Sequence, residues 1–193
     1  MTKDMIIGLL VGLIVGGFIG HQVGSSGSHA PAPVTAAPAM PGGMPPGMPS
    51  APGPEIQARI SSLQSVVARD PKNHQAWVQL GNDYFDTHQP QKAIEAYGRA
   101  LELKPNDPNV LTDQGVMYRD LGQFDKALAN FEKASQADPK HVQSLFNIGV
   151  VYANDLKQPK KAADAWNKVI QVAPASPQAG QAKQAIAELG PAK

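Results

Sequence analysis

The sequence predicts an all-α protein whose folded part is a stack of helix pairs. One residue pattern recurs at an interval of 34 residues between His74 and Pro174. Within each copy the apolar residues are spaced as on one face of a helix, and prolines and small polar residues stand where helices begin and end. A repeat of this length forms two helices and buries its apolar face only against neighbouring copies, so the pattern predicts an α-solenoid.

The first copy of the pattern consists of Trp77, Leu80, Gly81, Tyr84, Ala93, Tyr97, Ala100 and Pro105. The second copy, 34 residues later, consists of Leu111, Gln114, Gly115, Tyr118, Ala127, Phe131, Ala134 and Pro139. The third begins at the same interval and then shifts by one residue, giving Leu145, Ile148, Gly149, Tyr152, Ala162, Trp166, Val169 and Pro174. This order of residues at this period resembles the tetratricopeptide repeat (TPR). The resemblance covers roughly half of the chain and implies three TPR repeats with flanking capping helices.

Residues 1–24 are expected to form a transmembrane signal-anchor helix. Residues 5–20 are apolar throughout, and with the uncharged residues that follow, about 20 positions pass without a charge, enough at 1.5 Å per residue to cross ~30 Å of hydrocarbon. A cleaved secretory signal is the alternative, but its positive region would consist of Lys3 and the amino terminus, offset by Asp4. The same positive charges favour a cytoplasmic N-terminal end. We therefore expect a single-pass protein of a bacterial-type inner membrane, with the TPR domain exported to the periplasm.

The expected membrane helix has a glycine at every fourth position, which places the glycines on one face. Such a face lets a second helix approach closely in lipid. Glycine is also simply tolerated in membrane helices, so the spacing favours homo-oligomerisation without requiring it. The residues expected in this helix packing are Gly8, Gly12, Gly16, Gly20 and Gly24.

Residues 25–54 are expected to be a disordered linker rich in proline, glycine and methionine. Proline at this density disfavours helix and favours an extended, solvated chain that holds the repeats away from the membrane. Met40, Met44 and Met48 recur every four residues, and thioethers are soft ligands that suit Cu(I). A copper-handling protein is thus one alternative function, although the prolines prevent a helix that would bring the three sulfurs to one face.

Residues 55–70 read as an N-terminal capping helix, because their apolar residues have helical spacing and Pro71 ends them. The repeats are expected at residues 73–107, 108–141 and 142–175, and a C-terminal capping helix at 176–190. Asn73, Asp107 and Ser176 are the expected N-caps. The third repeat is one residue longer than the others, and we expect its turn, residues 154–160, to contain the extra residue.

Composition excludes several classes of function. The chain has no cysteine and a formal net charge of +1, so there is no thiolate chemistry and no reason to expect nucleic acid. The five histidines are scattered without a partner four residues away, and no nucleophile or phosphate-binding motif is present. We therefore expect no catalytic residues, no metal site, no cofactor and no enzymatic activity.

The TPR resemblance implies instead a concave groove that binds a protein or peptide partner. In the family, ligand contacts come mainly from five positions on the first helix of each repeat. Transferred to this chain, the expected peptide-binding groove contains Val78, Asn82, Phe85, Thr112, Val116, Arg119, Phe146, Val150 and Asn154. Val78, Phe85 and Phe146 have an alternative role, because apolar side chains there can pack against each other or against the adjacent helix.

The best-known TPR subgroup grips the C-terminal carboxylate of chaperone tails with a lysine and an asparagine of its first repeat. Asn82 matches that asparagine, but Val78 stands where the lysine is needed, and Val116 replaces a further polar residue. The expected partner is therefore an amphipathic helix or extended segment held by an apolar surface.

Taken together, these features predict a membrane-anchored TPR adaptor or scaffold. Its layout resembles the TPR domains of bacterial cytochrome c biogenesis factors, which hold an apocytochrome segment for haem attachment. The alternative is an oligomeric structural scaffold of a surface or membrane machine, assembled through the glycine face.

Overall fold

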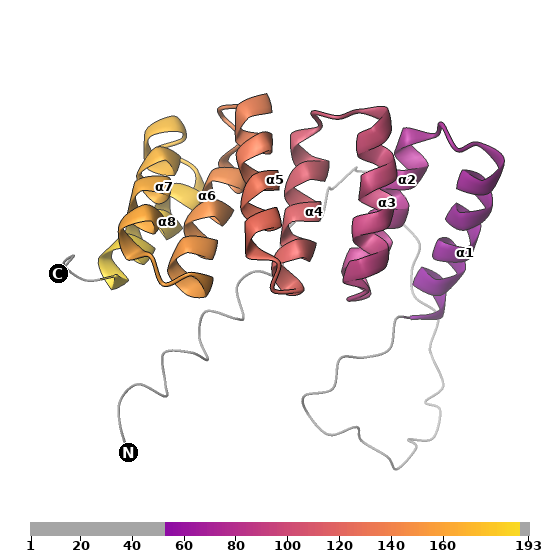
Figure 1. Ribbon diagram of the computed structural model, residues 1–193, viewed down its shortest axis with the longest axis horizontal. Helices are drawn as coiled ribbons and strands as arrows, with labels where there is room; N and C mark the ends of the chain where they lie inside the picture. The colour runs from indigo at the N-terminus through magenta and orange to yellow at the C-terminus, as the bar shows by residue number, and fades with distance from the viewer. Residues whose placement is uncertain (1–52, 190–193) are drawn as a thin grey trace, which may run out of the picture. The chain divides into compact units, whose positions relative to one another are not determined.

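The computed structural model describes residues 53–189, which form an α-solenoid of eight helices and one π-helical turn without strands. Figure 1 shows the helices as a row in chain order, from α1 in indigo to α8 in yellow. The elements are α1 (Pro54–Arg69), α2 (His74–Asp86), α3 (Pro90–Leu103), α4 (Pro108–Asp120), α5 (Phe124–Ala137), α6 (Val142–Val150), η3 (Val151–Asp155), α7 (Pro159–Val172) and α8 (Pro177–Glu188). Helices α2 to α7 form three helix pairs, and α1 and α8 cover their ends.

Each of the three expected N-caps closes the start of a helix. The side chain of Asn73 accepts a hydrogen bond from the backbone N–H of Ala76, and that of Ser176 accepts one from Ala179. Asp107 accepts two, both from the first turn of α4. These side chains satisfy amide groups that have no partner within the helix. Proline occupies the first turn of α1, α3, α4, α7 and α8, where its missing N–H costs no hydrogen bond.

The two helices of each pair cross where a glycine meets an aromatic ring. A Cβ on Gly81 would lie 2.5 Å from ring atoms of Tyr97, and a Cβ on Gly115 would lie equally close to Phe131. Gly149 and Trp166 repeat the arrangement in the third pair. The repeat glycines are therefore required for close approach of the two helices.

A lysine lies over a tyrosine ring in every repeat. The Nζ atom of the lysine is 5.2–5.5 Å from the ring centroid in the pairs Lys92–Tyr84, Lys126–Tyr118 and Lys161–Tyr152. A cation at this distance over an aromatic face is attracted by the ring quadrupole. The lysine belongs to the start of the second helix and the tyrosine to the first helix, so the pair reinforces the same crossing.

Gln114 replaces the leucine of the first repeat at a buried position and links three helices. Its amide nitrogen donates to the backbone carbonyl of Ile94 on α3 at 2.9 Å. Its carbonyl oxygen accepts from the side chain of Asn130 on α5 at 2.8 Å. A buried amide that makes both bonds costs little, because neither polar end is left unpaired.

The extra residue of the third repeat lies in the helix and not in the turn, where we expected it. In the first two repeats the N–H of Gln89 and of Gln123 bonds to a carbonyl five residues earlier, whereas Gln158 reaches Tyr152, six residues earlier. The additional residue is accommodated by η3, in which the N–H of Leu156 bonds to Val151. Because one helical turn is widened, the residue with positive φ that follows this helix takes the position that a residue with positive φ has in the other two repeats. The crossing at Gly149 is thus preserved.

The expected membrane helix, its glycine face and the methionine-containing linker lie outside the described residues. Within residues 53–189, no helix combines the length and the apolar character needed to cross a membrane.

Candidate functional site

The first helices of the repeats form the concave side of the solenoid. Helix α2 contacts α4, and α4 contacts α6, in addition to the contacts that each makes with the helices next to it in sequence. The second helices of successive repeats, α3, α5 and α7, make no comparable contacts with each other in the described part of the chain. The stack therefore curves toward α2, α4 and α6, which form what we call the concave surface.

The apolar residues expected in the groove are half-buried on this surface. Val78, Phe85 and Val116 pack against the core formed by α1 to α4 while keeping part of their surface exposed. Phe146 and Val150 do the same against the core of the third repeat. Phe146 also lies against Trp166, with the ring centroids 6.1 Å apart. The packing expected of Val78, Phe85 and Phe146 is thus observed, and because part of each side chain stays exposed, their role in binding remains a prediction.

Two of the expected polar groove residues are engaged within the chain. Asn82 is exposed, but its side-chain carbonyl oxygen accepts a hydrogen bond of 2.9 Å from the hydroxyl of Tyr97. Thr112 is completely buried, and its hydroxyl donates to the carbonyl of Pro108 at 2.7 Å. Asn154 is exposed. The structure therefore leaves Asn154 open to a ligand and places Thr112 beneath the surface.

Arg119 on the concave surface and Arg59 on the adjacent helix α1 are both paired with aspartates of neighbouring elements. Arg119 of α4 forms a two-pronged pair with Asp155 at the end of η3, with distances of 2.5 Å and 3.2 Å. Arg59 of α1 forms a similar pair with the buried carboxylate of Asp83. Each guanidinium group is thus already matched to a carboxylate in the geometry that it prefers.

Sequence reasoning overlooked one carboxylate of this surface, Asp113 on α4. It is half-buried, and within residues 53–189 its side chain forms neither a hydrogen bond nor an ion pair. Burial raises its pKa to about 6, and the negative charges of Asp107 and Asp86 add to the effect. Helical spacing of three residues from the predicted groove residue Val116 was the signal that could have identified it.

A pocket next to these residues lies between α1 and α2. Its volume is about 320 Å³, and it is lined by Arg59, Gln79, Asn82, Asp83 and Asp86. Asp86 is exposed, and it also has no ion-pair partner in the described part of the chain. This end of the concave surface is therefore polar and anionic.

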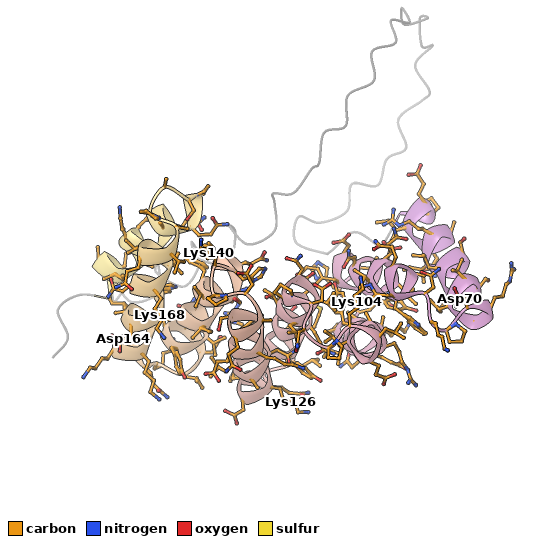
Figure 2. The ribbon with its side chains drawn as sticks, turned by 90° about the horizontal axis from the view of Figure 1, so that it is seen from above. Asp70, Lys104, Lys126, Lys140, Asp164 and Lys168 are labelled. Atoms are coloured by element: carbon orange, nitrogen blue, oxygen red, sulfur yellow. The ribbon has the colours of Figure 1, made fainter. Side chains whose placement is uncertain are left out.

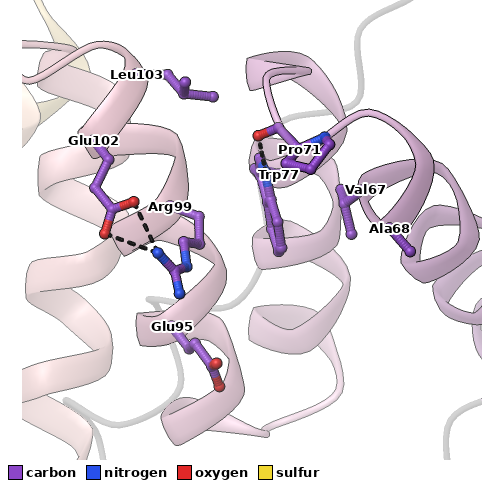
Figure 3. Close-up of a pocket in the computed structure, with 8 residues that line it drawn as sticks. All are labelled: Val67, Ala68, Pro71, Trp77, Glu95, Arg99, Glu102 and Leu103. Carbon is purple, nitrogen blue, oxygen red and sulfur yellow. Dashed lines mark hydrogen bonds and ion pairs between the residues drawn. The ribbon is translucent and has the colours of Figure 1, made fainter.

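A second pocket, of about 440 Å³, lies between α1 and α3 (Figure 3). Trp77 lines it, with its indole nitrogen donating to the carbonyl of Pro71 at 2.9 Å. Arg99 and Glu102 line the opposite side and are paired with each other at 3.0 Å. The lining therefore combines apolar side chains with the paired charges of Arg99 and Glu102 and the carboxylate of Glu95.

No group of three or more potential ligands that could hold a metal ion occurs among the described residues. The groups present on the concave surface are apolar side chains, amides and carboxylates.

Three comparisons with known proteins agree that this chain contains TPR repeats. A family model described as the cytochrome c-type biogenesis protein H TPR domain matches residues 51–179. The small glutamine-rich tetratricopeptide repeat-containing protein 2 of Mycosarcoma maydis is 31% identical over 97 residues, which are 50% of this chain and 27% of that protein. The TPR repeat-containing protein MJ0798 of Methanocaldococcus jannaschii is 31% identical over 98 residues, 51% of this chain and 29% of that protein. The chain thus spans between a quarter and a third of the length of these relatives.

Solved structures show the same architecture. The crystal structure of MamA superposes with a TM-score of 0.65 at 21% identity, covering 70% of this chain and 77% of that one. A tetratricopeptide repeat protein from Parabacteroides merdae gives a TM-score of 0.62 at 21% identity, covering 70% and 54%. At this level of identity the likeness concerns the fold alone.

Proposed function

This chain belongs to the family of the cytochrome c-type biogenesis protein H TPR domain, and from that premise we propose that its concave surface binds a segment of another protein. The repeats act as an adaptor, because all the chemistry on this surface is suited to holding a partner. The sequence-based interpretation as a TPR protein similar to these domains is confirmed by the family model and by the solenoid itself.

The observation that carries the proposal is the row of half-buried apolar side chains along the first helices. Val78 and Phe85 on α2, Val116 on α4, and Phe146 and Val150 on α6 keep part of their surface exposed on one side of the solenoid. A helix with its own apolar stripe, or an extended segment, would bury that exposed surface.

The family supports a place in cytochrome c maturation, with an apocytochrome c segment as the partner. We further propose that residues 1–24 anchor the chain in a bacterial-type inner membrane and that the repeats work on the periplasmic side. The apolar, charge-free stretch of residues 5–20 supports this arrangement.

Titration of labelled apocytochrome c with the purified chain tests the binding function. Val116→Glu with Phe146→Glu should weaken binding at least ~10-fold, because a charge replaces apolar contact in the middle of the groove. Leu103→Glu with Val172→Glu is the matched control, since these residues are on second helices, are apolar, and are each 37% exposed. Equal binding by both double variants would contradict the proposal.

Phe146 also packs on Trp166, so loss of binding in the first variant needs a check on folding. The milder pair Val116→Thr and Phe146→Ala removes apolar area without adding a charge, and circular dichroism confirms that the helices remain. The proposal requires weaker binding by this variant at unchanged helix content.

We also propose that the glycine face of residues 8–24 joins two or more copies in the membrane. The spacing of four residues supports this assembly. Crosslinking in membranes should lose its dimer product when Gly12 and Gly16 are changed to leucine, and an unchanged product would disprove the association.

A further inference from the structure

The charges of the solenoid are separated between its two layers. Helices α2, α4 and α6 with η3 contain five aspartates and one arginine, a formal charge of −4, and no lysine. Helices α3, α5 and α7 contain seven cations and five carboxylates, a formal charge of +2. The whole chain is nearly neutral at +1, so the negative charge of the concave surface does not follow from composition.

The internal ion pairs occupy the arginines that could otherwise balance this negative charge. Arg119 is occupied by Asp155, and Arg59 is occupied by Asp83. No cation is therefore left on the first helices to balance Asp86 and Asp113, neither of which has an ion-pair partner within residues 53–189. A bound anionic segment would meet uncompensated negative charge and no available cation.

Two of the carboxylates without an ion-pair partner lie beside the apolar part of the concave surface, and a third, that of Asp120, ends α4. Asp86 follows Phe85 directly at the end of α2, and Asp113 precedes Val116 by one turn of α4. Helix α2, which bears Asp86, contacts helix α4, which bears Asp113, across the boundary between the first and second repeats. Apolar and anionic surface are thus presented together.

The fold itself does not explain Asp113. An aspartate without partners in a half-buried position opposes its own ionisation, because water and counter-charges are both withdrawn. A cation supplied from outside would remove this penalty. The same reasoning does not apply to Asp83, since Arg59 already compensates it.

We infer that the partner of the concave surface is a cationic amphipathic segment, whose apolar side chains contact Phe85 and Val116 and whose lysine or arginine side chains face Asp86 and Asp113. This inference rests on the proposed binding function and adds the charge of the partner to it. Complementary charge of this kind favours the right partner and repels anionic competitors.

Three peptides of about 18 residues test the inference, all with the same leucine stripe on one helical face. The polar face contains lysines in the first peptide, glutamines in the second and glutamates in the third. We expect the lysine peptide to bind the full chain at least ~10-fold more tightly than the glutamate peptide. Raising NaCl from about 50 to about 300 mM should reduce that preference, because salt screens exposed charges.

The double variant Asp86→Asn with Asp113→Asn should reduce the preference to less than ~3-fold, since it removes the two charges that we assign to the cations of the partner while keeping size and polarity. Asp125→Asn with Asp164→Asn is the control of equal charge change, because both residues are exposed on second helices. Asp164 is labelled on α7 in Figure 2, which views the row from above. The control should retain the full preference.

The possible results distinguish failure of this inference from failure of the proposed binding function. If apocytochrome c binds but the glutamine or glutamate peptide binds as tightly as the lysine peptide, the inference is overturned and the proposed function stands. Equal loss of preference in the control variant likewise overturns it, since total charge would then be the cause. If neither apocytochrome c nor any peptide binds, the proposed function fails and the inference fails with it.

Discussion

Arg119 in the second repeat and Asp155 in the third are joined by a two-pronged ion pair that crosses the boundary between repeats. The side chains are 27% and 16% exposed, so the pair is largely withdrawn from solvent. Removing one partner from such a pair leaves a charge that is partly buried and uncompensated.

We therefore expect Asp155→Asn to lower the free energy of unfolding by about 1–3 kcal/mol. The double variant Arg119→Met with Asp155→Asn should lose less than the sum of the single changes, because it leaves no orphaned charge. Urea denaturation of the four proteins gives the coupling energy. Additive losses would mean that the pair contributes nothing to the boundary.

Gly149→Ala should destabilise the third repeat by about 2–4 kcal/mol, since the added methyl group meets the indole ring of Trp166 where the helices cross. Gly180→Ala is the control within another helix. A Cβ at Gly180 meets no atom within 4 Å, so this change should stabilise α8 by about 0.5–1 kcal/mol. Thermal unfolding followed by circular dichroism distinguishes the two directions, and a neutral Gly149 variant would show that Trp166 can move aside.

Asp113→Asn should stabilise the protein at neutral pH. The pKa of Asp113 is raised to about 6 in the folded state from an ordinary value of 3.8, so the folded state binds more protons between these two values. Stability therefore falls as pH rises from about 4 to about 6, and the full cost is present above about 6. The asparagine variant should gain roughly 1–2 kcal/mol at pH 8 after allowance for solvent screening, and no gain at pH 3.5. A gain of equal size at both pH values would attribute the effect to packing.

His141 should contribute the opposite dependence on pH. Its Nδ1 accepts from the N–H of Ser144 at the start of α6, and its Nε2 lies 3.0 Å from the side-chain oxygen Oδ1 of Asn109. Burial lowers its pKa below 6.5, with Asp138 and Asp107 opposing the shift. Stability from this residue is present above pH 6.5 and is lost as pH falls through the lower folded value, because protonation of Nδ1 destroys the N-cap.

A His141→Asn variant keeps a capping side chain without an imidazole. Its free energy of unfolding should vary less between pH 7 and pH 5 than that of the parent chain, and nuclear magnetic resonance of the imidazole protons gives the folded pKa directly. A folded pKa at or above 6.5 would contradict this assignment.

The sequence predicted those parts of the fold that depend on local rules. Caps such as Asn73 and Ser176 and the crossing at Gly81 follow from short-range sterics and hydrogen bonding, and they repeat at a fixed period. The place of the extra residue in the third repeat did not follow, because a helix can widen at almost the same cost as a turn can lengthen. Only the packing around Trp166 decides between them.

The candidate site was predicted less completely, since its accessibility depends on partners far away in the sequence. Arg119 was expected in the peptide-binding groove, but Asp155, 36 positions later, pairs with it. Thr112 has the spacing of a groove residue, yet the neighbouring repeat covers it completely. The position of a residue on a helix predicts which way its side chain points, whereas the exposure of that side chain depends on the residues of the next repeat that pack against it.

The buried amide of Gln114 gives the repeats a fixed order. Its two hydrogen bonds require a carbonyl on the helix before it and the amide of Asn130 on the helix after it. Leucine occupies the equivalent position of the first repeat and isoleucine that of the third, and neither side chain can donate such a bond to the preceding repeat. Asn130 belongs to the second repeat and would move with Gln114, whereas the carbonyl of Ile94 belongs to the first. The three repeats share one pattern of residues but are not interchangeable modules, because a chain with its first two repeats exchanged would lose the bond that joins the second repeat to the first.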